Sequence, residues 1–200
     1  MFERFTEKAV NVVSTSQKLA KEAGASKVAP EYLLLALFDE AKGISLKIFK
    51  SYDITHEKLE KEVQKYVSSN MRNTVQTVTL PFDIEYKEIL KKTLDLANKS
   101  GHQTILYEHL FLSVISDRKS NNVKILENLG FDIYKSKNLL EKLVQKKIKR
   151  LYHPEIDENN ATPENKAQET DNIFNSKESE KVFERAVAKL STSNYEILGT

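Results

Sequence analysis

Residues 30–37 read Pro-Glu-Tyr-Leu-Leu-Leu-Ala-Leu, and residues 107–112 read Tyr-Glu-His-Leu-Phe-Leu. In each stretch a glutamate opens an apolar run long enough for the buried face of a helix. Pro30 stands in the first turn, where a proline is well tolerated. Glu31 and Glu108 are 77 residues apart. A fixed offset between two such stretches indicates that the chain contains one helical unit twice.

The repeat extends in both directions from these stretches, with matching caps, stops and core positions. An aromatic residue and an N-cap precede the first helix of each unit, as Phe5-Thr6 and Phe82-Asp83. A glycine ends that helix in each unit, as Gly24 and Gly101. Each unit has the periodicity of four helices. The sequence therefore predicts an all-α fold of eight helices, arranged as a pseudo-twofold pair.

The predicted domain spans residues 1–152, with unit one at 1–67 and unit two at 80–150. The intervening stretch 68–79 is polar and β-branched, which favours an extended connection. Within unit one the fourth helix is expected to start after Thr55 and to bury a face that runs from Leu59 to Val67.

The C-terminal part differs in charge from this domain. Residues 1–154 carry a net charge of +7, whereas residues 155–180 carry −6. We therefore expect a disordered acidic linker at 153–174. A helix at 175–200 follows, and it echoes the first unit-two helix when shifted by 93 residues. It is interpreted as the start of a truncated third repeat, with a generic amphipathic helix as the alternative.

Composition excludes several classes of protein. The 200 residues are 40% hydrophobic and 30% charged, with a net charge of +2 and no cysteine. Disulfides and thiolate metal sites are therefore excluded, and a reducing cytosol is the default. No apolar stretch approaches the roughly 20 residues that span a bilayer, and the N-terminus does not have the form of a signal peptide. The expectation is a cytoplasmic protein without a membrane partner.

Several motifs resemble the double repeat at the N-terminus of Clp/Hsp100 unfoldases, most closely the ClpC branch. The opening residues 1–9, Met-Phe-Glu-Arg-Phe-Thr-Glu-Lys-Ala, look like that family's start. The two stretches quoted first resemble its Glu-His-Leu-Leu helix start. Leu129-Gly130-Phe131-Asp132 resembles the turn before the fourth helix of a unit. The resemblance implies a double Clp-repeat N-terminal domain.

The chain lacks the ATPase modules of an entire Clp protein. No Gly-x-x-x-x-Gly-Lys-Ser/Thr stretch occurs, so there is no phosphate-binding loop. We expect no catalytic residue, no metal and no cofactor. The chain is either a fragment of a longer ATPase or a stand-alone relative that carries the recognition module alone.

The resemblance also implies a ligand site. In ClpC relatives the glutamates that match Glu31 and Glu108 bind the guanidinium of phosphoarginine, and its phosphate lies at the first helix start beside a threonine. Thr6 matches that threonine in unit one, and Asp83 replaces it in unit two. The candidate sites are therefore Thr6 with Glu31 and Asp83 with Glu108, the second weakened by its negative charge. From the residues alone, a glutamate in a first turn can equally be explained by its favourable interaction with the helix dipole, without any ligand.

Other polar residues point to no chemistry of their own. The pattern that starts at His56 has Glu60 where a zinc-protease helix has its second histidine, so the metal-ligand pair is missing. His109 is interpreted as part of the helix start rather than as a base. The basic run from Lys142 to Arg150 is expected to be a solvated helix end.

The predicted function is a non-catalytic module that binds protein substrates or adaptor proteins for a Clp-type unfoldase–protease system. One alternative is a stand-alone accessory subunit that docks on Clp unfoldase or protease subunits and contacts no substrate. A weaker alternative is a helical domain that binds nucleic acid through the basic run at 142–150, which has little aromatic interleaving for base stacking; nucleic acid is not an expected partner.

Overall fold

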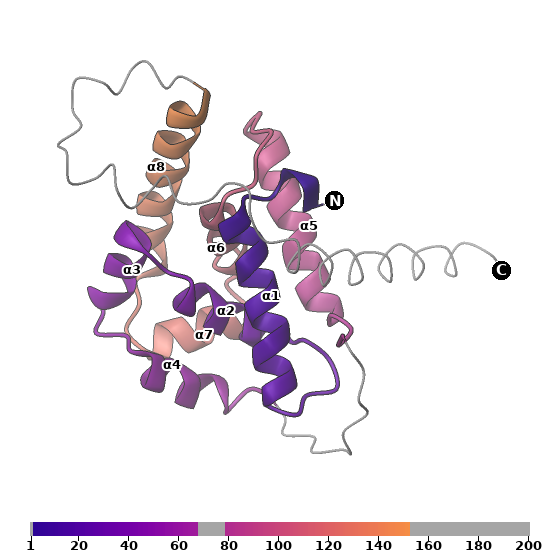
Figure 1. The fold of residues 1–200 in the computed structure, drawn as a ribbon. Helices are drawn as coiled ribbons and strands as arrows, with labels where there is room; N and C mark the ends of the chain where they lie inside the picture. The colour runs from indigo at the N-terminus through magenta and orange to yellow at the C-terminus, as the bar shows by residue number, and fades with distance from the viewer. Residues whose placement is uncertain (1, 68–78, 153–200) are drawn as a thin grey trace.

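The computed structural model describes residues 2–67 and 79–152 (Figure 1). In order along the chain, the elements are η1 (Phe2–Arg4), α1 (Glu7–Glu22), α2 (Pro30–Asp39), α3 (Gly43–Lys50), α4 (His56–Val63), α5 (Ile84–Lys99), α6 (Tyr107–Val114), α7 (Asn121–Asn128) and α8 (Ile133–Tyr152). Over residues 2–67 and 79–152, the predicted all-α fold with eight α-helices, four to a unit, is confirmed. The predictions for residues 68–78, for the linker at 153–174 and for the helix at 175–200 lie outside the described residues.

The first helices of the two units, α1 and α5, begin and end alike. The side chain of Thr6 accepts a hydrogen bond from the Ala9 N–H, and that of Asp83 accepts one from the Ile84 N–H. After each helix a glycine takes a φ of +68°, at Gly24 and at Gly101. This left-handed conformation is costly for residues with a Cβ atom, so glycine ends both helices.

Two isolated parallel bridges join the units, and in each one the segment before the first helix of one unit pairs with a segment of the other unit. Phe5, before α1, pairs with Ile105 of the other unit, and Phe82, before α5, pairs with Val28. The Thr6 N–H donates to the Ile105 carbonyl at 2.9 Å. The Asp83 N–H donates to the Val28 carbonyl at 3.0 Å. Because Phe5 and Phe82, like Val28 and Ile105, are 77 residues apart, the two bridges are pseudo-twofold equivalents.

The second helices, α2 and α6, form the centre of the domain. Every residue from Pro30 to Leu37 and from Tyr107 to Val114 is buried, which explains why these stretches are apolar on nearly every face. In the view of Figure 1 they lie in the middle, with α1, α5 and α8 around them. The rings of Phe49 and Phe111 stack across the units with centroids 5.0 Å apart.

The fourth helix of unit one is shorter than predicted. It ends at Val63, and Tyr66 and Val67 are half-buried in the turns that follow. The Tyr66 N–H donates to the Val63 carbonyl, and the Lys65 N–H donates to the Glu62 carbonyl. These bonds span three residues and join one α-helical bond, from the Val67 N–H to the Val63 carbonyl, in a tightened end of the helix.

Candidate functional site

Glu31 lies in the first turn of α2 and is 4% exposed. Its Oε1 accepts a hydrogen bond from Nδ2 of Asn121, at the start of α7 in the other unit, at 2.9 Å. The neighbouring Asn122 donates to the Pro30 carbonyl at 3.1 Å. Burial raises the pKa of the Glu31 carboxyl, and the bond from Asn121 opposes part of that rise. Glu31 therefore ties the start of α2 to the start of α7.

Glu108 is the counterpart of Glu31 in α6 and is 1% exposed. Its Oε1 accepts from the Ser45 hydroxyl of α3 at 3.3 Å and from the Lys147 ammonium of α8 at 3.0 Å. Its Oε2 is buried without a hydrogen-bond partner among the described residues. A buried carboxylate oxygen without a donor is costly. Glu108 therefore keeps one acceptor available for a cationic donor.

Lys8, in α1, lies next to Glu108. Its ammonium is 4.2 Å from the centroid of the Tyr107 ring. Burial lowers the pKa of Lys8 to about 8, and the negative charge of Glu108 limits the fall. The positive charges of Lys147 and Lys42 add to it. The start of α1 thus brings the ammonium groups of Lys8, Lys147 and Lys42 near the carboxylates of Glu108 and Glu40.

Thr6 and Asp83 are both N-caps, but their charge environments differ. The Asp83 carboxylate forms an ion pair with the Lys27 ammonium at 2.6 Å. Burial raises the pKa of Asp83, but the hydrogen bonds from Lys27 and from the Ile84 N–H outweigh it, so the pKa is lowered. Asp83 is therefore a charged cap that is already neutralised by a lysine.

The two bridges between the units bring the segments of the four predicted residues together across the units. The bridge between Phe5 and Ile105 places Thr6 beside the segment that leads into Glu108. The bridge between Val28 and Phe82 places Asp83 beside the segment that leads into Glu31, and the two carboxylates interact electrostatically. Each helix start therefore meets the glutamate of the other unit. The pairing of Thr6 with Glu31 and of Asp83 with Glu108 as ligand sites stays a prediction, but the bridges favour pairs across the units, because a repeat offset equates residues without saying which copies touch.

This exchange defines two unequal sites. The α1-side site consists of Thr6, Lys8, Ser45, Glu108 and Lys147. The α5-side site consists of Glu31, Asp83 with its ion-pair partner Lys27, Glu85, Asn121 and Asn122. Under the 77-residue offset, Lys8 corresponds to Glu85 and Thr6 to Asp83. The α1-side site is therefore basic around its carboxylate, whereas the α5-side site is acidic.

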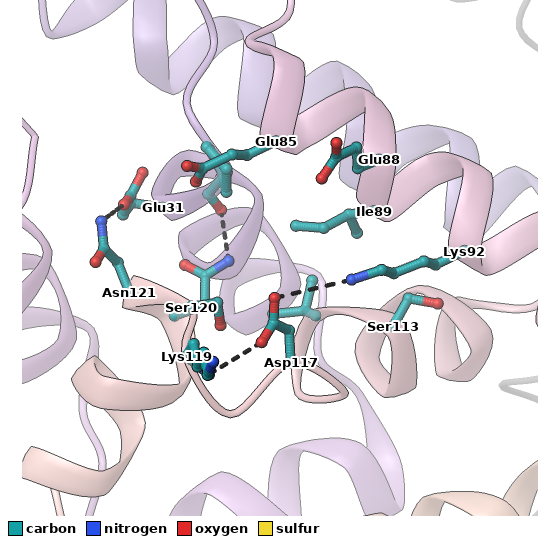
Figure 2. Close-up of a pocket in the computed structure, with 13 residues that line it drawn as sticks. Glu31, Glu85, Glu88, Ile89, Lys92, Ser113, Asp117, Lys119, Ser120 and Asn121 are labelled. Carbon is teal, nitrogen blue, oxygen red and sulfur yellow. Dashed lines mark hydrogen bonds and ion pairs between the residues drawn. The ribbon is translucent and has the colours of Figure 1, made fainter.

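A pocket of about 280 Å³ overlaps the α5-side site and shares Glu31, Glu85, Asn121 and Asn122 with it (Figure 2). Its lining comes from α2, α5, α6 and α7 and the loop before α7, and consists of Pro30, Glu31, Glu85, Glu88, Ile89, Lys92, Ser113, Val114, Asp117, Lys119, Ser120, Asn121 and Asn122. Figure 2 shows Glu85, Glu88, Ile89 and Lys92 lined up along α5. Apart from Glu31, sequence reasoning missed these residues.

The remaining candidate residues take structural positions. The His109 ring is buried, where it accepts from the Leu106 N–H at 2.9 Å and contacts the His102 ring at 3.1 Å. His56 is exposed, 3.2 Å from Asp39. Lys147 does not belong to a fully solvated helix end as expected, because it bonds the buried Glu108. Within residues 2–67 and 79–152, no His, Asp and Glu side chains are grouped so that they could hold a metal ion.

Comparisons with known proteins agree with this fold. The family described as "Clp repeat (R) N-terminal domain" matches residues 4–85 and again residues 81–200. The chain is 37% identical over 132 residues to the chloroplastic chaperone protein ClpC2 of Arabidopsis thaliana, which covers 66% of this chain and 14% of that protein. The chain therefore belongs to the Clp repeat N-terminal domain family, and it spans about a seventh of this relative's length.

Solved structures show the same fold. The N-terminal domain of ClpD from Arabidopsis thaliana superposes with a TM-score of 0.62 at 23% identity, over 72% of this chain and 97% of that domain. The N-domain of ClpV in complex with VipB peptide has a TM-score of 0.53 at 15% identity, over 68% and 84% of the two chains. In the part of the chain that the structure describes, no helix is long and apolar enough to cross a bilayer.

Proposed function

We propose that this chain is a non-catalytic recognition module that binds protein substrates or adaptors for a Clp-type unfoldase–protease system. The observation that carries the proposal is the Glu108 carboxylate, which is buried in the first turn of α6 beside the start of α1, with Oε2 unpartnered among the described residues. Membership of the family supports it, and peptide binding by the ClpV N-domain is a precedent within the same fold.

The proposed mark on the substrate is phosphoarginine, bound at the α1-side site. A guanidinium has donors for the free oxygen of Glu108. The phosphate would lie at the N-terminus of α1, where backbone N–H groups and the helix dipole favour an anion. Thr6 caps that helix, and Lys8 supplies a nearby positive charge. The ligand's two opposite charges thus meet complementary groups.

Lys147 sets a condition on this binding. Its ammonium occupies Oε1 of Glu108, and its side chain is 40% exposed. A guanidinium that takes both carboxylate oxygens displaces Lys147 toward solvent, where the lysine can pair with the phosphate. The module then exchanges an internal ion pair for a ligand ion pair.

The α5-side site does not suit a phosphate. The Lys27 ammonium offsets the charge of Asp83, but Glu85 in the first turn of α5 and Glu31 beside it leave the site negative. Like charges about 4 Å apart repel by roughly 4 kcal/mol at an effective dielectric near 20. The helix dipole returns only about 0.3–1 kcal/mol. We therefore assign phosphoarginine to the α1-side site alone.

Fluorescence anisotropy with the full 200-residue chain tests this assignment. A labelled peptide with one phosphoarginine should bind, and Glu108→Gln should weaken binding at least tenfold. Glu31→Gln is the matched control, because it makes the same change at the equivalent position, and it should alter affinity less than twofold. Equal losses from both variants would contradict the assignment. Absence of any peptide binding would favour a docking subunit that contacts no substrate.

A further inference from the structure

The pocket that overlaps the α5-side site is the pseudo-twofold counterpart of a space that the α1 side fills with Tyr107. Tyr107 opens α6 and is 1% exposed, and the residue in the same place at the start of α2 is Pro30. The Tyr107 hydroxyl donates to the Leu37 carbonyl at 2.5 Å. Proline has no side chain that could make such a contact. One half of the domain is therefore plugged by its own residue and the other half is open.

The surroundings of Tyr107 support this equivalence. Its ring contacts Lys8, its hydroxyl contacts Leu37, and the charges of Glu108 and Glu40 act on it. The counterparts of these four residues at the 77-residue offset are Glu85, Val114, Glu31 and Asp117. All four line the pocket. The position of Tyr107 therefore indicates the size and shape of a group that would fill the open pocket.

The open pocket differs from its plugged counterpart in charge. Where Lys8 lies over the Tyr107 ring, the open pocket has Glu85. Four carboxylates and two ammonium groups line it, from Glu31, Glu85, Glu88, Asp117, Lys92 and Lys119. The lining therefore favours a cation where the plugged side holds a neutral ring.

Two acceptors in the lining are also without donors. Val114 is the counterpart of Leu37, and no residue described by the structure donates a hydrogen bond to its carbonyl. Asn122 is 1% exposed, and its Oδ1 has no partner among the described residues. The pocket therefore combines negative charge with unpaired acceptors. A ligand that fits it needs a positive charge, several donors and a flat shape.

We propose that this pocket binds the unmodified arginine side chain of a protein partner. A guanidinium is planar like the Tyr107 ring, carries five N–H donors and stays charged at every physiological pH. One edge can donate to the Val114 carbonyl while the other faces Glu85 and Glu31. A phosphorylated arginine is rejected, because its phosphate meets the same carboxylates. The inference rests on the proposed function in that the ligand is part of a protein.

Peptides that differ in one side chain test the proposal on the full chain. Labelled peptides with a single arginine, citrulline or phosphoarginine are compared by fluorescence anisotropy at low ionic strength. Citrulline keeps the shape of arginine without its charge. The arginine peptide should bind at least tenfold more tightly than the citrulline peptide. Comparable binding of these two would overturn the proposal.

Two variants locate the site. Pro30→Tyr recreates the plug and should weaken arginine binding at least tenfold while leaving phosphoarginine binding within twofold. Glu85→Lys recreates the charge of the plugged side at an exposed position, so it tests the site even if Pro30→Tyr folds poorly. It should have the same effect. Glu57→Lys, an exposed first-turn glutamate in α4, is the matched control. Unchanged arginine affinity in Glu85→Lys would overturn the proposal.

The outcomes separate this proposal from the proposed function. If phosphoarginine binds and arginine does not, the pocket assignment fails and the recognition function stands. If arginine binds with the predicted variant pattern and phosphoarginine does not, the pocket assignment stands and the mark is different. If neither peptide binds, both proposals fail.

Discussion

The Tyr86 hydroxyl of α5 and the Ser16 hydroxyl of α1 are 2.7 Å apart, and both side chains are fully buried. The Ser16 hydroxyl donates its own proton to the Val13 carbonyl at 2.7 Å. The Tyr86 hydroxyl must therefore be the donor to Ser16. Burial raises the pKa of the Tyr86 phenol well above its usual range, so the phenol keeps that proton at neutral pH.

The direction of this hydrogen bond predicts an asymmetric effect of mutation. Ser16→Ala leaves the Tyr86 hydroxyl buried without an acceptor, which should lower the free energy of unfolding by about 1–3 kcal/mol. Tyr86→Phe leaves Ser16 bonded to Val13 and should cost about 1 kcal/mol or less. Urea denaturation of the two variants and of the double variant measures this. A larger loss in Tyr86→Phe than in Ser16→Ala would contradict the assigned direction.

We expect the protein to lose stability in mild acid because His102 and His109 are buried next to each other. Burial lowers the pKa of His109 to about 4, with a further contribution from His102. The unfolded chain takes up this proton near pH 6.5, whereas the folded protein excludes it until about pH 4. The stabilisation is therefore complete above pH 6.5 and is lost between pH 6.5 and 4. From pH 7 to 5 the loss amounts to about 2 kcal/mol.

Chemical denaturation of His109→Gln tests this dependence. Glutamine is an ordinary residue at this position of a helix, and it can still accept from the Leu106 N–H. The variant should show a smaller decrease of unfolding free energy between pH 7 and 5 than the parent protein. Parallel curves for the two proteins would mean that His109 does not carry the effect.

We expect the hydrogen bonds from Arg4 to the other unit to contribute to the stability of the fold. Its guanidinium donates to the Gln103 carbonyl at 2.7 Å, to the His102 carbonyl at 2.6 Å and to Asn98 Oδ1 at 2.7 Å. A lysine cannot make this forked set of bonds. Arg4→Lys should therefore lower the unfolding free energy by about 1 kcal/mol. The exposed Arg118→Lys is the control, and equal effects would contradict the role given to the fork.

We expect substitutions of Lys147 and of Glu108 to have coupled effects on the free energy of unfolding. Lys147→Met removes the ammonium from a carboxylate that is 1% exposed, so the unfolding free energy should fall by about 1–3 kcal/mol. Adding Glu108→Gln should recover part of this loss, because the buried charge is then gone. Thermal and urea denaturation measure both variants. Lys146→Met, at an exposed neighbour, should be neutral, and a similar loss there would refute the coupling.

The repeat made most of the fold predictable, because each cap and stop occurs twice. Thr6, Asp83, Gly24 and Gly101 have the local roles that their residue types favour. Local signals of this kind act within a few residues and can be seen in one sequence. The length of α4 was overestimated because apolar residues after Val63 pack against the core from a turn.

The candidate site was less predictable, because it depends on contacts between the units. Sequence spacing placed Glu31 and Glu108 in first turns, but it gave no sign that Asn121 and Lys147 cover them. The pocket could have been suspected from one difference between the copies, Pro30 against Tyr107. That difference acquires meaning only when the surroundings of Tyr107 are known.

The two bridges between the units are reciprocal, as contacts across the axis of a symmetric homodimer are. In a twofold pair of identical chains, residue i of one subunit meets residue j of the other, and j meets i in return. Phe5 with Ile105 and Val28 with Phe82 obey this rule inside one chain. In a homodimer every substitution appears on both sides of the axis. When the two copies lie in one chain, each can change separately. One half can therefore keep an open pocket beside Pro30 while Tyr107 fills the equivalent space in the other half.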